Sequence, residues 1–144
     1  MPEKETLERA EKDKREGKAA STQAGEFVRE EIEHVREGKH GARSTKQVIA
    51  IGLSKARRAG VKLRPPKKAS KKTREQAERE LRNGKSATKP SSKRSRAREK
   101  ALKREPHKAA SKAALSRHAK SAAHKRTKAE RSASAKKAAR TRKK

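Results

Sequence analysis

The feature that most limits how this chain can fold is its excess of positive charge. The sequence has 46 lysine and arginine residues against 17 aspartate and glutamate residues, a formal net charge of +29 in 144 residues. Because like charges repel one another in a compact state, this imbalance opposes folding and indicates a polyanionic partner. Nucleic acid is the most abundant polyanion, so the charge favours nucleic-acid binding.

Large apolar side chains are scarce. Hydrophobic residues make up 28% of the sequence, and Phe27 is the one aromatic residue. Low hydrophobicity with high net charge is typical of chains that cannot bury enough apolar surface to offset their lost conformational entropy. The lack of cysteine excludes disulfides and cysteine-ligated zinc fingers, and a single aromatic residue provides no platform on which bases stack. With no signal peptide or membrane span in the sequence, we expect a cytoplasmic, nucleoid-associated protein.

The charge divides the sequence into two parts. Residues 1–37 carry 8 basic and 11 acidic side chains, whereas residues 38–144 carry 38 basic and 6 acidic ones. We predict a mostly α-helical head at 1–60, a proline- and lysine-rich linker at 61–72, and a basic arm at 73–144 that is largely disordered.

Helical periodicity and capping residues predict the helices. The predicted ranges are 3–16, 23–37, 45–59 and, more weakly, 73–82, and Gly17, Gly38 and Gly60 end the first three. Ser21 or Thr22 is expected to cap the second helix, and capping boxes are expected at Ser44–Gln47 and Thr73–Gln76. The second helix presents Val28, Ile32 and Val35 on one face. Self-association through helices 23–37 and 45–59 is expected, because so short a head has a weak core.

Two resemblances follow from these segments. Residues 21–60 read STQAGEFVREEIEHVREGKHGARSTKQ and VIAIGLSKARRAG, and they resemble a family of small, basic bacterial proteins of unknown function. Members of that family are often labelled DNA-binding, and the resemblance implies no catalytic or ligand residue. Residues from about Lys67 to Lys144 are similar to the lysine-, alanine-, serine- and proline-rich tails of histone-H1-like proteins.

Phosphate contacts are expected along the basic part of the chain, because each cation that neutralises a phosphate releases a condensed counterion. The predicted contact residues are Arg43, Lys46, Arg57, Arg58, Lys67, Lys68, Lys71, Lys72, Lys93, Arg94, Arg96, Arg98, Lys136, Lys137, Arg140, Arg142, Lys143 and Lys144. The helix pair 23–37 and 45–59 has two interpretations: a helix-turn-helix with the second helix in the major groove, or a simple helical hairpin.

Catalysis and metal binding are not expected. The sequence has no glycine-rich phosphate loop and no HExxH motif, and its five histidines are predicted to be solvent-exposed. The acidic residues Glu30, Glu31, Glu33 and Glu37 are predicted to form a solvated face of their helix or a dock for the arm. We therefore predict a protein that is not an enzyme and that needs no cofactor.

The function predicted from the sequence is non-specific DNA binding through the phosphate backbone, as in nucleoid-associated or histone-H1-like proteins. One alternative is an RNA- or ribosome-associated protein, because basic arms also contact folded RNA. Another is a protein-interaction module in which the helical head binds a partner and the arm localises it to the nucleoid. An anionic membrane is disfavoured as a partner, because large apolar side chains for interfacial burial are nearly absent.

Overall fold

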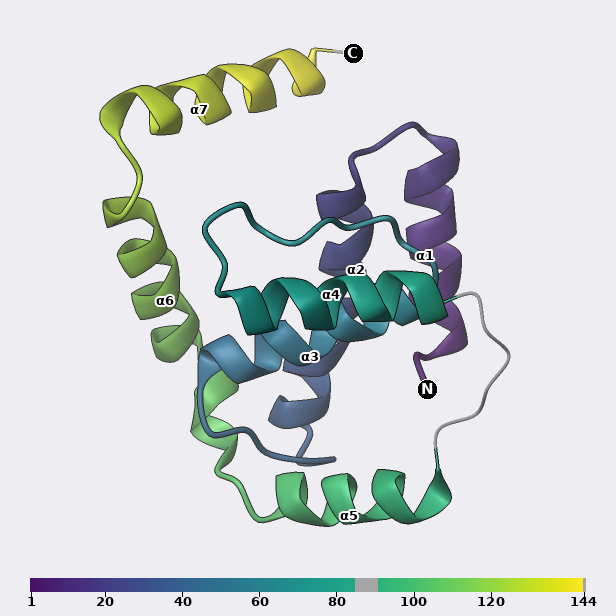
Figure 1. The fold of residues 1–144 in the computed structure, drawn as a ribbon. Helices are drawn as coiled ribbons and strands as arrows, with labels where there is room; N and C mark the ends of the chain where they lie inside the picture. Colours follow the sequence, from purple (N-terminus) through teal and green to yellow (C-terminus); the bar gives the residue numbers. More distant parts are fainter. Residues whose placement is uncertain (85–90, 144) are drawn as a thin grey trace.

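The computed structural model describes residues 1–84 and 91–143, and every regular element in these ranges is helical (Figure 1). The elements are α1 (Lys4–Arg15), α2 (Ala20–Arg36), α3 (Thr45–Arg58), α4 (Lys71–Asn83), α5 (Ser92–Lys103), the 3-10 helix η1 (His107–Ala110), α6 (Lys112–His124) and α7 (Lys128–Arg142). The prediction of a mostly α-helical chain is confirmed, and the four predicted helices correspond to α1 through α4.

Helices α2 and α3 form the centre of the molecule, with α1 packed against α2 and α4 against α3. The two central helices approach very closely at Gly52, where an added Cβ atom would lie 2.6 Å from the Cα of Val28. Beside this contact lies a small apolar core made mostly of short side chains. Its buried members are Ala10, Ala24, Phe27, Ala56 and Val61.

A second buried cluster joins the end of α2 and the start of α3 to a segment from much later in the chain. Its members are Val35, Ala42, Val48, Ala109 and Ala110, the last two from η1. Side chains of the central helices also bind the backbone of η1. Arg36 Nε donates to the carbonyl oxygen of Ala110 at 2.8 Å, and Thr45 Oγ1 donates to that of Ala109 at 2.7 Å. The basic part of the chain therefore contributes to the core.

The prediction of a long disordered arm is wrong. Helices α5, α6 and α7 occupy most of residues 92–142 and run around the outside of α1 to α4 (Figure 1). Low hydrophobicity limits how much core a chain can bury, but it does not prevent local helix formation. Alanine, lysine and arginine are among the best helix formers, and Ser111 and Thr127 cap α6 and α7 with their side chains. Docking of η1 then anchors the segment to the rest of the fold.

The cap predicted for α3 is confirmed in part. Ser44 Oγ accepts a hydrogen bond from the Gln47 N–H at 3.2 Å, as expected. The Gln47 side chain, however, accepts from the N–H of Arg43 at 2.7 Å, one residue earlier than in a capping box. The glycines predicted to end the first three helices all have positive φ angles, of 70° at Gly17, 76° at Gly38 and 97° at Gly60.

The caps predicted for α2 and α4 are wrong. Helix α2 begins at Ala20 without a side-chain cap, so neither Ser21 nor Thr22 caps it. Helix α4 is capped by Ser70, whose Oγ accepts from the N–H of Thr73 at 3.2 Å. The predicted cap of α4 therefore lies inside its first turn, because a serine three residues earlier offers the same chemistry.

Two glutamates predicted to face solvent are buried. Glu30 and Glu31 are 2% and 1% exposed and share Lys55 of α3, whose ammonium lies 3.2 Å from Glu30 Oε1 and contacts Glu31 Oε1. Burial opposes ionisation of Glu30, but hydrogen bonds from the Thr6 side chain and the Glu3 N–H, together with the charge of Lys55, hold the pKa of that carboxyl below its ordinary value. The face of α2 that packs inward is therefore partly acidic.

The stability of α7 depends on interactions within the helix. We expect the capping box at its start to be the most important of them. Thr127 Oγ1 accepts from the Glu130 N–H at 3.2 Å, and Glu130 Oε2 accepts from the Thr127 N–H at 2.8 Å. We expect Thr127→Ala to destabilise α7 by about 1 kcal/mol. Amide exchange within residues 128–142 should then be faster than in the parent protein, while exchange in α2 stays the same.

The same capping box makes α7 sensitive to acid. The hydrogen bond from the Thr127 backbone, followed by that from its side chain, lowers the pKa of Glu130. Because the pKa of Glu130 is lowered in the folded state, its ionised carboxylate stabilises α7. This stabilisation is complete at pH values above the ordinary pKa of glutamate, and it is lost as the pH falls through the lowered pKa. Acid-induced fraying of α7 should disappear in the Glu130→Gln variant, and equal fraying in both proteins would contradict this.

Within residues 1–84 and 91–143, none of the helices combines the length and the apolar composition needed to cross a lipid bilayer.

Candidate nucleic-acid interface

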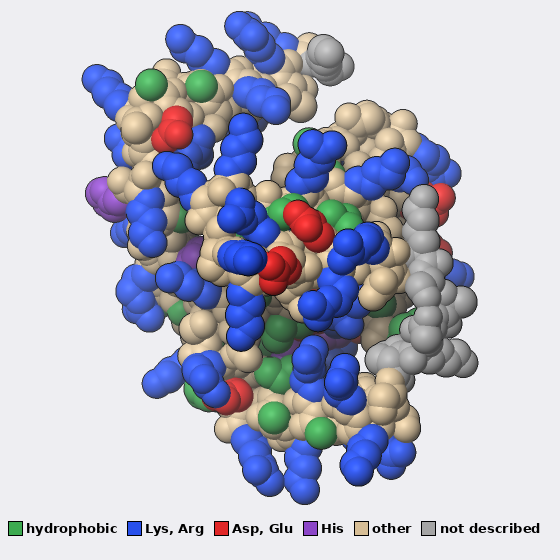
Figure 2. Space-filling view, viewed as in Figure 1, with side chains coloured by type: hydrophobic (Ala, Val, Ile, Leu, Met, Phe, Trp, Pro, Cys, Tyr) green, Lys and Arg blue, Asp and Glu red, His purple; other side chains and the backbone are tan. Residues whose placement is uncertain are grey.

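Basic side chains dominate the last three helices. Residues 91–143 contain 20 lysine and arginine residues against 3 acidic ones. Every residue of α7 is exposed, and so is every residue of α5 except Leu102, which is partly buried. Figure 2 shows lysine and arginine side chains along the outer edge of α5 and around α7. The two helices therefore present cations in several directions rather than on one face.

Few of these cations are neutralised within the protein. Two ion pairs of the described structure involve residues 91–143. Lys103 pairs with Glu99 at 2.8 Å, and Glu105 pairs at 3.7 Å with Arg43, which lies in the loop between α2 and α3. The other basic residues of this range have no carboxylate within 4.0 Å among the residues that the structure describes. By contrast, many cations of α1 and α2 pair with acids on the same helix or its neighbour. Most of the unpaired cations of the described residues thus lie in residues 91–143, and others, such as Lys46, Lys67 and Lys68, lie on α3 and between α3 and α4.

The end of α5 is held against the loop between α2 and α3. The N–H of Gly41 donates to the carbonyl oxygen of Leu102 at 2.9 Å, and the N–H of Ala42 donates to that of Pro106 at 3.1 Å. The backbones approach so closely that a Cβ atom at Gly41 would lie 1.8 Å from the carbonyl oxygen of Glu105. These contacts place α5 on one side of the molecule, whereas α7 lies on the opposite side (Figure 1).

Most residues predicted to contact phosphate are exposed. They are Arg43, Lys46, Arg58, Lys67, Lys68, Lys71, Lys72, Lys93, Arg94, Arg96, Arg98, Lys136, Lys137, Arg140, Arg142 and Lys143. Arg57 is 8% exposed; it donates to the carbonyl oxygen of Leu63 at 3.1 Å and pairs with Glu80 at 3.4 Å, so it joins α3 to α4. Lys144 lies outside the described residues. A further 11 exposed cations of residues 91–143 were not singled out, because no local pattern distinguishes them.

The surroundings of α3 bear on its interpretation as a recognition helix. Helices α2, α4, η1 and α6 all pack against it, and the side chain of Thr45 at its first position is bonded to η1. A recognition helix needs a free face and a free N-terminal turn to enter the major groove. Arg43 and Lys46 beside Thr45 are nonetheless exposed, so the choice between the helix-turn-helix and the simple helical hairpin stays a prediction.

The expected self-association through helices 23–37 and 45–59 stays a prediction. Val35 is fully buried within the chain, whereas Val28, Ile32 and Leu53 line a shallow groove together with Leu115 of α6.

Two histidines, predicted to be exposed, lie together beside a buried carboxylate. His34 and His40 are each 13% exposed in their side chains, and they flank Glu31 in a group whose ligand atoms lie within 4.8 Å of one another. The spacing of the histidines in the sequence could not predict this group. His118 and His124 on the outer helix α6 have the same separation as His34 and His40, so the spacing does not distinguish the two pairs. The missing signal was the burial of Glu31, which depends on the packing of α2.

A comparison with family models finds a match over part of the chain. Residues 13–69 match the model described as "Family of unknown function (DUF6496)", a range that contains α2, α3 and the segment leading to α4. The resemblance of residues 21–60 to a family of unknown function is confirmed to that extent. No curated protein and no solved structure matches the chain.

Proposed function

We propose that the protein binds nucleic acid, and duplex DNA in particular, by non-specific contacts between the basic side chains of α5 to α7 and the phosphate backbone. The observation that carries this proposal is the unneutralised charge of residues 91–143, where 20 basic residues meet 3 acidic ones and the ion pairs of the described structure involve few of them. Cations without an internal partner gain the most from meeting phosphate, because each contact releases a condensed counterion.

The arrangement of the helices supports backbone contacts rather than base recognition. Every residue of α7 and every residue of α5 except Leu102 is exposed, so several of their cations can follow a phosphate backbone in more than one orientation (Figure 2). Lysine and arginine contacts to phosphate carry no direct sequence information. The packing of α2, α4, η1 and α6 against α3 also limits how far this helix can enter the major groove. In this proposal the protein acts as a nucleoid-associated, histone-like binder without catalytic chemistry.

Neutralising α7 should weaken DNA binding strongly. We expect the quadruple change Lys136→Gln, Lys137→Gln, Arg140→Gln and Arg142→Gln to lower the affinity for a random duplex at least about tenfold near physiological salt. The slope of log affinity against log salt should become shallower by about 0.9 for each phosphate that the variant no longer neutralises. Fluorescence anisotropy across a salt series measures both quantities on the full chain.

A control variant with the same reduction of charge separates α7 from net charge. Lys4, Lys12, Lys14 and Arg15 lie on α1, where Lys4 and Lys12 pair with glutamates one turn later. Changing all four to glutamine should leave the salt slope nearly unaltered. If this control weakens binding as much as the α7 variant, the proposed role of α7 is wrong and binding follows net charge alone.

The same assay distinguishes DNA from RNA. Competition between a random duplex DNA and a structured RNA of equal length at equal salt should favour the DNA. A clear preference for the RNA would assign the phosphate contacts to an RNA partner instead.

A further inference from the structure

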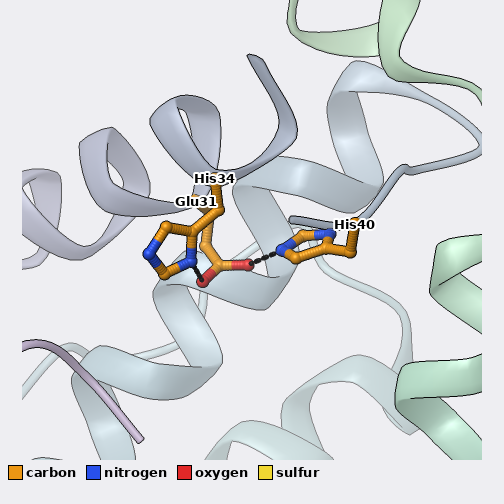
Figure 3. A group of neighbouring side chains, drawn as sticks. All are labelled: Glu31, His34 and His40. Carbon is orange, nitrogen blue, oxygen red and sulfur yellow. Dashed lines mark ion pairs between the residues drawn. The ribbon is translucent and has the colours of Figure 1, made fainter. Parts of the chain in front are cut away.

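The carboxylate of Glu31 lies in the interior with a histidine ring beside each of its oxygens (Figure 3). Glu31 is 1% exposed; His40 Nε2 lies 3.2 Å from its Oε2, and His34 Nδ1 lies 3.7 Å from its Oε1. The two imidazole rings are almost perpendicular, at 83°, with centroids 6.1 Å apart. One nitrogen of each ring and the carboxylate therefore face a common point.

The outer nitrogens of both rings have acceptor oxygens as neighbours. His34 Nε2 lies 2.9 Å from Glu3 Oε1, and His40 Nδ1 lies 3.0 Å from the carbonyl oxygen of Gly41. Each outer nitrogen can donate its N–H to one of these oxygens, which only accept hydrogen bonds. In that tautomer of the neutral rings, the nitrogens beside Glu31 offer their lone pairs to a cation, whereas without a cation they face a carboxylate that also only accepts. Metal-binding histidines show this arrangement, in which the outer N–H donates to a carboxylate or a backbone carbonyl.

The charge of this interior is not balanced by lysine alone. Glu30 and Glu31 are two buried carboxylates, and Lys55 is the one ammonium that the described residues place on them. Glu31 Oε1 has no hydrogen bond of acceptable geometry among the described residues, although the Lys55 ammonium contacts it. A buried carboxylate with two imidazole nitrogens beside it favours a further positive charge, which a bound cation supplies.

We propose that Glu31, His34 and His40 bind a divalent transition-metal ion, for which zinc is the best match. Two imidazoles and a carboxylate are ligands that zinc prefers, with water as the fourth ligand. In a tetrahedral zinc site neighbouring ligand atoms lie about 3.3 Å apart. The separations of 3.2 and 3.7 Å are to the two different oxygens of Glu31, and one ligand atom from each of the three residues lies within 4.8 Å of the others. The three side chains must therefore draw together to hold the ion. The ion takes the place of the Lys55 ammonium beside Glu31, and Lys55 remains paired with Glu30.

The bound ion would join three parts of the chain. Glu31 and His34 lie on α2, His40 lies in the loop that leads to α3, and Glu3 precedes α1 and holds His34. The metal therefore stabilises the junction of these segments. The site contains none of the cations of α5 to α7, although the loop that carries His40 contacts the end of α5. Zinc binding measured without nucleic acid therefore tests the site separately from the proposed function.

Isothermal titration of the full chain with zinc chloride at neutral pH tests the proposal. One zinc ion should bind per chain, and cobalt substituted for it should show the visible absorption of a four-coordinate site. The double change His34→Ala and His40→Ala should weaken binding more than 100-fold, since removal of one outer-shell partner already costs 10- to 100-fold. The matched control is His118→Ala with His124→Ala, which has the same spacing and should bind zinc like the parent.

A pair of surface variants tests the site without disturbing buried residues. Glu3 and Glu37 are both half-exposed and both pair with Lys39, but only Glu3 contacts His34. Glu3→Ala should lower zinc affinity about tenfold, whereas Glu37→Ala should leave it unchanged. The proposal is wrong if the parent takes up no zinc, if the His34/His40 variant folds and binds equally well, or if the two glutamate variants have equal affinities.

Discussion

Replacing Gly52 with valine should separate α2 from α3 and unfold the centre of the molecule. A Cβ atom at this position would lie 2.6 Å from the Cα and 2.9 Å from the backbone nitrogen of Val28. These are main-chain atoms inside a helix, so they cannot move aside as a flexible side chain can. The valine must push the two helices apart, and this also opens the core around Phe27 and Ala56.

The expected cost is about 3 kcal/mol or more, at the upper end of the range for overpacked interiors. The free energy of unfolding of a single domain is about 5 to 15 kcal/mol. The core of this protein is built mainly from alanine and valine, so a loss of this size is a large part of its stability. We therefore expect urea unfolding of Gly52→Val to show a greatly reduced midpoint or no cooperative transition.

Gly25→Ala is the matched control for this substitution. Gly25 lies within α2 and has no atom within 4 Å of an added Cβ, so alanine fits there. Because glycine is a poor helix former, Gly25→Ala should raise the free energy of unfolding by about 0.5 to 1 kcal/mol. If the Gly52→Val variant is as stable as the parent protein, α2 and α3 do not approach as closely as described.

Alanine at position 41 should release the end of α5 and η1 from the central helices. An added Cβ would lie 1.8 Å from the carbonyl oxygen of Glu105 and 2.4 Å from its carbonyl carbon. The loop and residues 102–106 must therefore separate, which breaks the two backbone hydrogen bonds between them. Once they separate, Ala109 and Ala110 leave the buried cluster that they form with α2 and α3.

The effect of Gly41→Ala should be local rather than global. We expect docking of residues 102–111 to weaken by about 1 to 3 kcal/mol, with faster amide exchange there and faster tryptic cleavage after Lys103 and Arg104. Helices α1 and α2 should keep most of their protection, because the first apolar cluster does not include η1. Gly25→Ala, the same chemical change where space exists, should alter neither readout. Unchanged cleavage in Gly41→Ala would contradict the docking.

Local sequence signals predicted the helices well where local interactions decide them. Gly17, Gly38 and Gly60 stop α1, α2 and α3 because the following turns need positive φ angles, which glycine adopts at little cost. Caps were less predictable, since several serines and threonines near one helix start offer the same hydrogen bond. Ser70 rather than Thr73 caps α4, and α2 starts without a side-chain cap.

The candidate sites were predictable to different degrees. The basic surface could be predicted from charge, because lysine and arginine in a chain with few acids and few apolar residues must face solvent. Arg57 is the exception: its burial depends on Glu80, which is 23 residues away and reaches it only through the packing of α4 on α3. The group of Glu31, His34 and His40 depends in the same way on which face of α2 is covered.

The sequence alone determined the positive charge, the helical character and the ends of several helices, because charge, propensity and glycine conformations act over a few residues. Tertiary structure decided that the basic region is not a free arm. Its anchor is a pair of alanines, Ala109 and Ala110, whose small side chains give no hydrophobic signal in a sequence rich in alanine. They become core residues only where Val35, Val48 and a glycine-lined loop leave a space of matching size, and this complementarity exists only in the folded chain.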